Sequence, residues 1–521
     1  MRDESDVVIV GAGSAGCVLA ARLSADPGVR VLLLEAGPDY VGSDLPPALL
    51  DSRRGPSIAP ATDWSLQGLS GLGGQILALP RGRVVGGSSA VNATFALRGS
   101  PADYDAWAAA GVEGWAFTDL LPAFRRLERD LDFGAAEYHG DSGPIPIGRY
   151  VGLEQSALAA AGAAALAAAG LATIDDHNAP GAVGVAPLPV NTVGGRRIST
   201  ASAYLDPVRH RPNLRVRGGA VVRRVLATAG AVTGVELMGG QIVTAPEVYL
   251  CAGAYLSPVV LLRSGIGPAD DLRALGIDVT ANLKGVGSNL HDHPATSVDL
   301  PYSGPLVGDP VFQLVGTTHS SAAHPHRDPP DLQLIVAGPY AGVEDGIASC
   351  FVGAALLKPH SRGRVRLRSA DPDVPPEIDL GYFTTATDLP RLLEGLAIAE
   401  AVVSHAAMRT LTAGQRVSPE SLSGKALKRY VVGNVWTYHH PVGTCAMGPD
   451  PEQGAVVDAG GRVYGVDGLS VVDAAILPEI PSANTNLPTI AAAEHIASRR
   501  LGSVAAAVVL NQNHSSRSTL P

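Results

Sequence analysis

The stretch Asp6–Glu35, DVVIVGAGSAGCVLAARLSADPGVRVLLLE, carries the clearest structural signal in the chain. A short apolar run, Val7 to Val10, leads into a glycine-rich turn, and a segment with apolar residues at helical spacing follows. The chain then returns as a second apolar run, Val29 to Leu34. This order of elements predicts a βαβ unit and, with it, an α/β protein that contains a Rossmann-type sheet.

The turn has a G-x-G-x-x-G pattern in which each glycine has its own function. Gly11 allows the tight turn, Gly13 lets the backbone approach a pyrophosphate, and Gly16 brings the helix against the strand. Glu35 ends the second strand, where its carboxylate can accept hydrogen bonds from a ribose. The alternative is a glycine-rich turn in an ordinary α/β core. The predicted dinucleotide-binding residues are Gly11, Gly13, Ser14, Ala15, Gly16, Glu35 and Ala36.

Length and charge limit the class of protein. A chain of 521 residues exceeds the size that one hydrophobic core usually supports, so we expect two or more domains. The sequence has 39 basic and 49 acidic residues, and its net charge of -10 argues against nucleic acid or an anionic membrane as a main partner.

The four cysteines are scattered and form no CxxC pair, which argues against a disulfide framework or a zinc site. We therefore expect reduced thiols and a cytoplasmic location. The first strand begins too early to leave room for a signal peptide. The longest apolar stretch, Leu153 to Leu171, is mostly alanine and is interrupted by polar residues and glycine. It predicts a buried or amphipathic helix and no integral membrane segment.

A second glycine-rich loop lies within Pro80–Asp105, PRGRVVGGSSAVNATFALRGSPADYD. Gly86, Gly87 and Ser88 offer backbone N–H and hydroxyl groups that could cradle a phosphate or the edge of a flavin. A buried run with one polar residue, Asn92, follows. On chemistry alone, a structural turn is equally compatible.

This loop, with Arg98-Gly99 and Tyr104-Asp105-x-Trp107 after it, resembles the first signature of the glucose-methanol-choline (GMC) family of flavoenzymes. The resemblance extends over most of the chain, and the bacterial choline dehydrogenase-like members are the most similar. It continues through Asn191–Leu205, Gly253–Pro268, Val286–Pro294, Leu357–Leu367, Tyr438–Gly448 and Gly465–Ile490.

The resemblance implies FAD as the cofactor. Val222 would lie against the adenine, although a core valine explains it equally well, and Asp473 and Ala474 would lie near the pyrophosphate and ribityl chain. In relatives with covalently attached FAD, a histidine precedes the asparagine of the first signature. Val91 stands there, so we predict non-covalent FAD. The further FAD contacts that the resemblance implies are Arg83, Gly86, Gly87, Ser88, Asn92, Ala93, Val222, Ala252, Asp473, Ala474 and Asn484.

Catalytic residues are expected near the C-terminal end of the resemblance. Histidine is well suited to accept a proton near neutral pH, and Pro441 favours an extended conformation for the residue before it. The family pattern H-x-V-G-T selects His440 as the base and leaves His439 a supporting role. Asn486 falls where relatives carry the second catalytic residue, and Asn484 is the weaker candidate. Alternatively, both amides cap the following helix.

The His291-Asp292-His293 triplet invites a metal hypothesis. No third ligand motif accompanies it, and alternate residues of an extended segment share a face without forming a site. We predict no metal. His291 departs from the glutamine that the family usually carries, and no function follows from that.

The sequence also predicts how the domains interleave. Residues 38–75 read as an irregular surface excursion. Segments 214–225, 232–238 and 241–250 predict a small antiparallel meander that returns to a buried strand. Strands and a helix near Asp388–His405 predict a smaller substrate-binding domain on an antiparallel sheet. The expected FAD-binding domain comprises 1–150, 197–295 and 437–505, the substrate-binding domain comprises 151–196 and 296–436, and 506–521 form a tail.

The implied reaction is oxidation of an alcohol. His440 would remove the hydroxyl proton, Asn486 would orient the alkoxide, and hydride would pass to flavin N5. We expect a dehydrogenase rather than an oxidase, with oxygen, a quinone or a redox carrier as the electron acceptor. The sparse aromatic residues, 5% of the chain, disfavour a quaternary ammonium substrate such as choline. The alternative is a non-oxidative enzyme of the same fold, such as a hydroxynitrile lyase or a fatty-acid photodecarboxylase.

Overall fold

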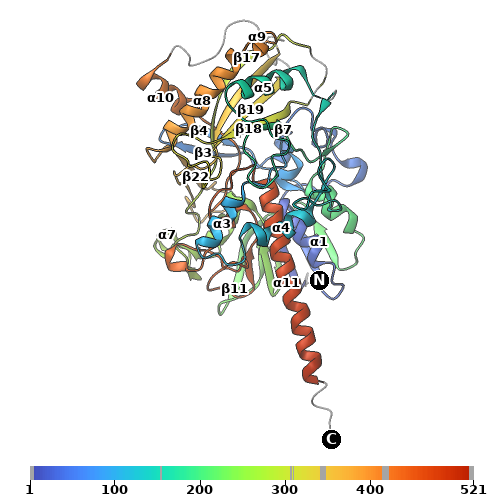
Figure 1. Cartoon of the computed structure of the whole chain (residues 1–521). Helices are drawn as coiled ribbons and strands as arrows, with labels where there is room; N and C mark the ends of the chain where they lie inside the picture. Colours follow the sequence, from blue (N-terminus) through green and yellow to red (C-terminus); the bar gives the residue numbers. More distant parts are fainter. Residues whose placement is uncertain are drawn as a thin grey trace.

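The structure is a computed structural model that describes residues 5–152, 155–305, 308, 310–340, 348–412 and 422–515, with side chains up to residue 501. The chain is built around two different sheets, one in each half of the molecule (Figure 1). We refer to these as the parallel-sheet half and the antiparallel-sheet half. The mixed α and β content agrees with the predicted fold class.

A five-stranded parallel sheet forms the core of the first half, in the lower part of Figure 1. Every pair of neighbouring strands in this sheet is parallel. The strands β1 and β2 are buried throughout, as expected for a sheet that is covered on both faces. The spatial order is β10 (Leu214–Arg217), β2 (Val31–Leu34), β1 (Val7–Val10), β14 (Glu247–Leu250) and β24 (Leu469–Val471).

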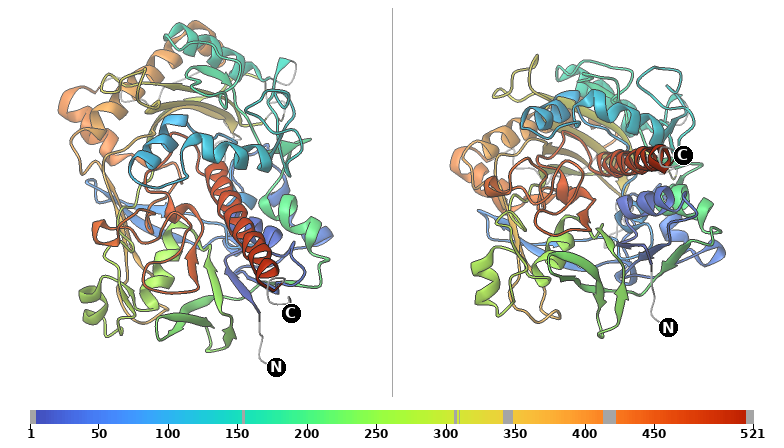
Figure 2. Two further views of the ribbon diagram at one scale, coloured as in Figure 1. Left: turned by 60° about the horizontal axis from the view of Figure 1, so that its bottom comes forward. Right: turned by 90° about the horizontal axis from the view of Figure 1, so that it is seen from below.

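Helix α1 (Ser14–Leu23) connects β1 to β2 and confirms the predicted βαβ unit. The C-terminal helix α11 (Asn486–Ser515) packs against α1 and α4 (Phe117–Leu127), and the view from below shows it between them (Figure 2). The predicted tail begins inside this helix, and residues 516–521 lie outside the described residues. Two further helices of this half are α3 (Pro101–Ala109) and α6 (Gly253–Arg263).

The predicted meander is present, but its first strand differs from expectation. Residues 214–225 form two strands rather than one, because the chain breaks at Gly218 and Gly219, the latter at a φ of 67°. The first of these strands, β10, joins the parallel sheet beside β2. The antiparallel meander consists of β11 (Val222–Thr228), β12 (Ala231–Leu237) and β13 (Ile242–Thr244).

The second half is organised around a six-stranded antiparallel sheet in the upper part of Figure 1. Helices α5 (Ala157–Ala168) and α8 (Asp388–Ser404) cover one face. Leu334 and Val336 pack into the cluster beneath these helices, while Ile335 points to the opposite face. The spatial order is β23 (Trp436–Thr437), β17 (Pro294–Pro301), β20 (Ser349–Leu356), β19 (Leu332–Tyr340), β18 (Phe312–Thr318) and β7 (Val185–Pro187).

A four-stranded sheet connects the two halves. Strands β3 (Leu66–Gly71) and β4 (Ile76–Leu79) form a hairpin, and β3 pairs with β22 (Glu377–Tyr382), which pairs with β21 (Arg364–Arg366). The expectation of an irregular excursion over 38–75 is therefore wrong for β3. The hairpin belongs to a segment assigned to the FAD-binding domain but pairs with the other one, so the domain ranges remain a proposal.

Shorter helices lie at the periphery of both halves. They are α2 (Pro47–Leu50), α7 (Ala269–Ala274), α9 (Ala406–Arg409) and α10 (Gly424–Gly433). Within the described parts of the chain, no helix combines the length and apolar character that a membrane crossing needs.

Candidate active site

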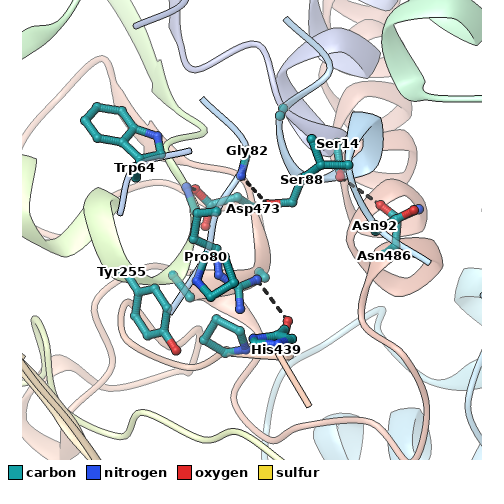
Figure 3. Close-up of a pocket in the computed structure, with 18 of the residues that line it drawn as sticks. Ser14, Trp64, Pro80, Gly82, Ser88, Asn92, Tyr255, His439, Asp473 and Asn486 are labelled. Atoms are coloured by element: carbon teal, nitrogen blue, oxygen red, sulfur yellow. Dashed lines mark hydrogen bonds between the residues drawn. The ribbon is translucent and has the colours of Figure 1, made fainter. Parts of the chain in front are cut away.

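A cavity of about 450 Å³ is lined by residues of both halves. One end lies at the β1–α1 turn of the parallel-sheet half, and the other end is walled by the antiparallel sheet. Figure 3 shows Ser14, Ser88 and Asn486 on one side of this cavity and His439 and Tyr255 on another. The two ends are described in turn.

The geometry of the first turn shows what each of its glycines allows. Gly11 has a φ of 100°, and a Cβ on it would lie 2.5 Å from the carbonyl oxygen of Cys251. A Cβ on Gly16 would lie 1.9 Å from the carbonyl oxygen of Gly11, so only glycine lets the helix approach the turn. A Cβ on Gly13 would meet nothing closer than 3.9 Å. Gly13 therefore borders open space, where a ligand can approach the backbone.

Glu35 lies at the end of β2, buried, and fixes the backbone around it. Its carboxylate accepts hydrogen bonds of 2.9 Å from the N–H groups of Ala12 and Gly37. Burial raises the pKa of Glu35 to about 7, although these backbone donors act in the opposite direction. The carboxylate is thus held at the cavity wall, where a ribose hydroxyl can reach it.

Most of the predicted cofactor-binding residues line the cavity. Three do not: Gly16 packs α1 against the turn, the N–H of Gly86 donates to Ala12 at 2.7 Å, and the guanidinium of Arg83 lies 5.3 Å from the ring centre of Trp64. These three residues lie behind the residues that line the cavity and pack against them. The predicted residues that line the cavity are Gly11, Gly13, Ser14, Ala15, Glu35, Ala36, Gly87, Ser88, Asn92, Ala93, Val222, Ala252, Asp473, Ala474 and Asn484.

Asp473 lines the cavity, but its carboxylate is engaged by the protein. It accepts hydrogen bonds from the N–H of Gly253 at 2.8 Å, the hydroxyl of Ser257 at 2.6 Å and the N–H of Ala475 at 2.7 Å. Asp473 therefore fixes the start of α6 against the β24 segment, and its effect on a bound cofactor acts through this backbone.

The residues present fit a flavin dinucleotide. Gly13 leaves open space beside a helix N-terminus, which suits a pyrophosphate, and Glu35 suits a ribose. Beside the same turn, the side-chain nitrogen of Asn486 is buried and has no hydrogen-bond partner in the protein. An unpaired buried donor facing a cavity calls for an acceptor from a ligand.

His440 lies at the other end and is held by its main chain and both ring nitrogens. Its N–H donates to Asp292 at 2.7 Å. Its Nε2 is 3.0 Å from the side-chain nitrogen of Asn484, and its Nδ1 is 3.0 Å from Nδ1 of His293. The tautomer of His440 that accepts from Asn484 carries its proton on Nδ1 and donates to His293. This network leaves Nε2 as the basic nitrogen.

Asp292 is the residue that positions this group of histidines. Its buried carboxylate accepts from the N–H groups of His293 and His440 and from the hydroxyl groups of Tyr382 and Thr437. The sequence triplet suggested a metal site, whereas in the structure Asp292 and His293 hold His440. Sequence reasoning missed both Asp292 and His293, although the triplet singled them out.

The environment keeps His440 neutral. Burial first, and then the neighbouring His293, His439 and the Arg81 guanidinium, hold the pKa of His440 well below its usual value of 6.5. The Nη1 group of Arg81 donates a hydrogen bond to the carbonyl of His439 at 2.9 Å. His439 has a φ of 65° and, like His440, lines the cavity. Its supporting role remains a prediction.

The structure does not bring Asn486 to His440. Asn486 is the first residue of α11, and its side-chain oxygen accepts from the hydroxyl of Ser14 at 2.8 Å (Figure 3). Asn484 precedes the helix and faces His440 instead. The two amides diverge because the backbone enters the helix between them. Of the two amides, Asn484 is thus the one that contacts His440, and Asn486 lies at the cofactor end.

One group of buried side chains has the spacing of a metal site, but it is an ion-pair network. Arg149 lies 2.9 Å from Asp130, and Arg98 pairs with Glu128. The positive charges that a metal would supply are thus already present. The absence of a metal remains a prediction. The three potential ligands are Glu128, Asp130 and His139.

Comparisons with known proteins agree with this site. Residues 5–295 and 359–493 match family models described as GMC oxidoreductase. The 5-(hydroxymethyl)furfural oxidase of Methylovorus sp. (strain MP688) is 40% identical over 94% of this chain and 98% of its own length. The oxygen-dependent choline dehydrogenase of Paraburkholderia phymatum is 37% identical over 96% and 93%.

A solved structure is similar over nearly the whole chain. Pyridoxine 4-oxidase from Mesorbium loti superposes with a TM-score of 0.86 at 32% identity, over 95% of this chain and 99% of that protein. These matches cover both halves of the molecule and the cavity between them. The chain belongs to the GMC oxidoreductase family, whose cofactor is FAD.

Proposed function

We propose that this protein oxidises an alcohol to an aldehyde or ketone at His440. The observation that carries the proposal is the His440–Asn484 pair, which closes the end of the cavity opposite the nucleotide-binding turn. The names of the relatives reported for the active site are those of enzymes that oxidise alcohols, which supports the same class of reaction.

The histidine supplies the base. Because its pKa lies well below 6.5, His440 is neutral at pH 7 and its Nε2 can accept the proton of a substrate hydroxyl. Asn484 donates to the same region and orients the oxygen as negative charge develops on it. His293 accepts from Nδ1 of His440, which keeps the proton off Nε2 before the reaction and stabilises the imidazolium afterwards.

The cofactor end provides the other reactant. FAD, when bound, supplies the acceptor for the hydride from the carbon that carries the hydroxyl. The turn at Gly13, Glu35 and the amide of Asn486 would hold it. We also propose that FAD is bound without a covalent link, because the aliphatic side chain of Val91 lines the cavity where such a link would form. Acid or heat precipitation should release all the yellow colour; colour that stays in the pellet contradicts this.

We propose further that the enzyme is a dehydrogenase that passes electrons to a quinone or a redox carrier. The similarity to a protein named a dehydrogenase supports the first part, whereas the words "oxygen-dependent" in that name and the relative named an oxidase favour oxygen as acceptor. Slow recovery of the flavin colour in air would support a dehydrogenase, and recovery within the turnover time would establish an oxidase.

A cytoplasmic location is part of the proposal. All four cysteines are buried and free, as in a reducing compartment. Cell fractionation with an antibody to the protein tests this, and recovery from a periplasmic or secreted fraction would contradict it.

The deciding experiment is anaerobic mixing of the yellow protein with a panel of primary and secondary alcohols while the flavin absorbance is followed. Bleaching by one or more alcohols is expected. His440→Ala should retain FAD and bleach about a hundredfold to ten-thousandfold more slowly, because general-base assistance is lost. If no alcohol bleaches the wild-type protein, the lyase or photodecarboxylase alternative takes its place.

A further inference from the structure

Six aromatic side chains form a closed belt around the substrate end of the cavity. We define this aromatic belt as Phe95, Phe312, Tyr340, Phe351, Trp436 and Tyr438, all of which line the cavity. Each ring contacts the next one, and the contact between Tyr438 and Phe95 closes the belt. The centroid distances lie between 5.1 and 6.5 Å. Aromatic residues are sparse in the whole chain, so their concentration here needs a cause.

The belt lies directly beside His440, the proposed catalytic base. The ring of Tyr438 lies 4.4 Å from the ring of His440, centroid to centroid. Phe312, Tyr340, Phe351 and Trp436 come from four different strands of the antiparallel sheet or their ends, and edge-to-face contacts hold most of the rings in place. A molecule inside the belt would therefore present its nearest end to His440.

The charges around the belt decide what such a molecule can be. Among the described residues, the carboxylates that line the cavity are Glu35 and Asp473, and both belong to the nucleotide end. Arg81 lines the cavity beside His439, and its Nε and Nη2 are buried without a protein partner. This positive charge opposes a cationic substrate, even though aromatic rings alone would attract one.

Two acidic residues lie near the belt without lining the cavity. The buried carboxylate of Asp292 is engaged by four donors of the protein, and Asp299 is the second. Asp299 pairs across the sheet from Phe351, but its side chain is exposed, accepts from the hydroxyl of Ser297 and does not line the cavity. Its charge contributes, after burial, to the raised pKa of Tyr340, but its carboxylate does not line the cavity and so does not contact a molecule there. The belt is thus an aromatic chamber with no carboxylate among the described residues that line it.

We propose that the aromatic belt receives a flat aromatic or heteroaromatic ring, and that the substrate is an uncharged alcohol with a hydroxymethyl group on that ring. This inference rests on the proposed alcohol oxidation. A flat ring fills the space between facing rings with offset-stacked or edge contacts, which a saturated ring of the same size cannot make equally well. Its hydroxymethyl group then reaches Nε2 of His440.

Two matched pairs of alcohols test the proposal on the FAD-loaded enzyme. Benzyl alcohol and cyclohexylmethanol differ in flatness, and choline and 3,3-dimethylbutan-1-ol differ in charge at nearly equal shape. We expect kcat/KM for benzyl alcohol to exceed that for cyclohexylmethanol by about tenfold, the worth of one or two aromatic contacts. We also expect 3,3-dimethylbutan-1-ol to exceed choline. Equal values in the first pair, or preference for choline in the second, would overturn the proposal.

Variants of the belt locate the effect. Phe351→Leu and Trp436→Leu should raise KM for benzyl alcohol about tenfold, change kcat little and reduce the preference over cyclohexylmethanol. Phe133→Leu, which changes an aromatic residue outside the cavity, is the matched control and should leave KM unchanged. Flavin content and Tm show which variants are folded. Unchanged KM in both folded belt variants would contradict the proposal.

Calorimetry separates this inference from the proposed function. His440→Ala lacks the base and is expected to react far more slowly, so with FAD bound and oxygen excluded the binding of an alcohol is measured with little turnover. Benzyl alcohol should bind more tightly than cyclohexylmethanol. If wild-type enzyme oxidises aliphatic alcohols best and the calorimetric preference is absent, the belt proposal fails while alcohol oxidation stands. If no alcohol is oxidised but the binding preference persists, the proposed function fails and the belt remains a site for flat rings.

Discussion

The two ends of the cavity are constructed in opposite ways. The nucleotide end consists largely of backbone from a few short segments, with glycines at places where a Cβ would collide with a carbonyl oxygen. The substrate end consists of side chains from strands far apart in the sequence, held by contacts among themselves. A backbone site tolerates almost no substitution, whereas a side-chain site can change its substrate while the fold persists. Four predictions test this difference.

Substitution of Gly11 should have the largest effect. Gly11→Ala places a methyl group 2.5 Å from the carbonyl oxygen of Cys251 and forces alanine to a φ of 100°. We expect loss of bound FAD and a decrease of about 3 kcal/mol or more in the free energy of unfolding. Flavin absorbance per protein and urea unfolding measure these quantities.

Gly240→Ala is the matched control, because Gly240 also has a positive φ, 85°, but a Cβ there meets nothing within 4 Å. It should lower stability by only about 1 kcal/mol and retain FAD. Full flavin content in Gly11→Ala would show that the nucleotide-binding turn is less rigid than its geometry implies.

Substitutions of Asn484 and Asn486, only two positions apart in the sequence, should affect different ends of the cavity. Asn484→Ala removes the donor beside His440, so we expect kcat to fall about a hundredfold with FAD retained. Asn486→Ala removes the partner of Ser14 and a donor at the cofactor end, so we expect weaker FAD retention and a smaller change in kcat of the loaded enzyme. Stopped-flow flavin reduction and flavin dialysis measure the two effects. The opposite result would restore Asn486 as the catalytic amide.

The same difference explains what the sequence could and could not predict. The βαβ unit and the glycine turn follow from adjacent residues, so periodicity and spacing suffice for them. The choice between Asn484 and Asn486 depends on where α11 begins and on the position of Ser14 and His440, which local sequence does not contain. The break between β10 and β11 was missed because the strand-like pattern on both sides hides a two-residue turn.

The belt could not be predicted for a related reason. Its rings lie in segments between Phe95 and Tyr438, and each alone reads as an ordinary core residue. The low aromatic content of the whole chain gave no sign that aromatic residues gather at one place. Likewise, the function proposed for His293 depends on a contact between two segments that are distant in sequence. Side-chain sites assembled from many segments become visible only when the tertiary structure is known.

Glu35 should make FAD binding depend on pH. Burial disfavours its carboxylate and raises its pKa to about 7 in the cofactor-free cavity, so the neutral form predominates below that pH. A neutral carboxyl is a weaker acceptor for ribose hydroxyls, so the Kd for FAD should rise up to about tenfold as the pH falls from 8 to 6. Glu35→Gln is uncharged throughout and should bind FAD weakly with no such dependence. A Kd that is constant with pH in the wild type would contradict the assignment of this residue to the ribose.

Substitution of Arg81 should have the smallest effect, which is a shift in the pH dependence of kcat/KM. Burial is the main cause of the low pKa of His440, and the Arg81 guanidinium adds to it. Because the base must be neutral, a low pKa preserves activity as the pH falls. Arg81→Met removes one positive charge, so the pKa of His440 should rise and the acidic limb of log kcat/KM should move to higher pH, with the plateau at pH 8 changed less. Arg81→Lys retains the charge and should keep the wild-type limb, measured with benzyl alcohol from pH 5 to 9. A limb that stays in place in Arg81→Met would mean that burial and the neighbouring histidines alone set the basicity of His440, and that the substrate end, like the nucleotide end, is governed by its immediate packing.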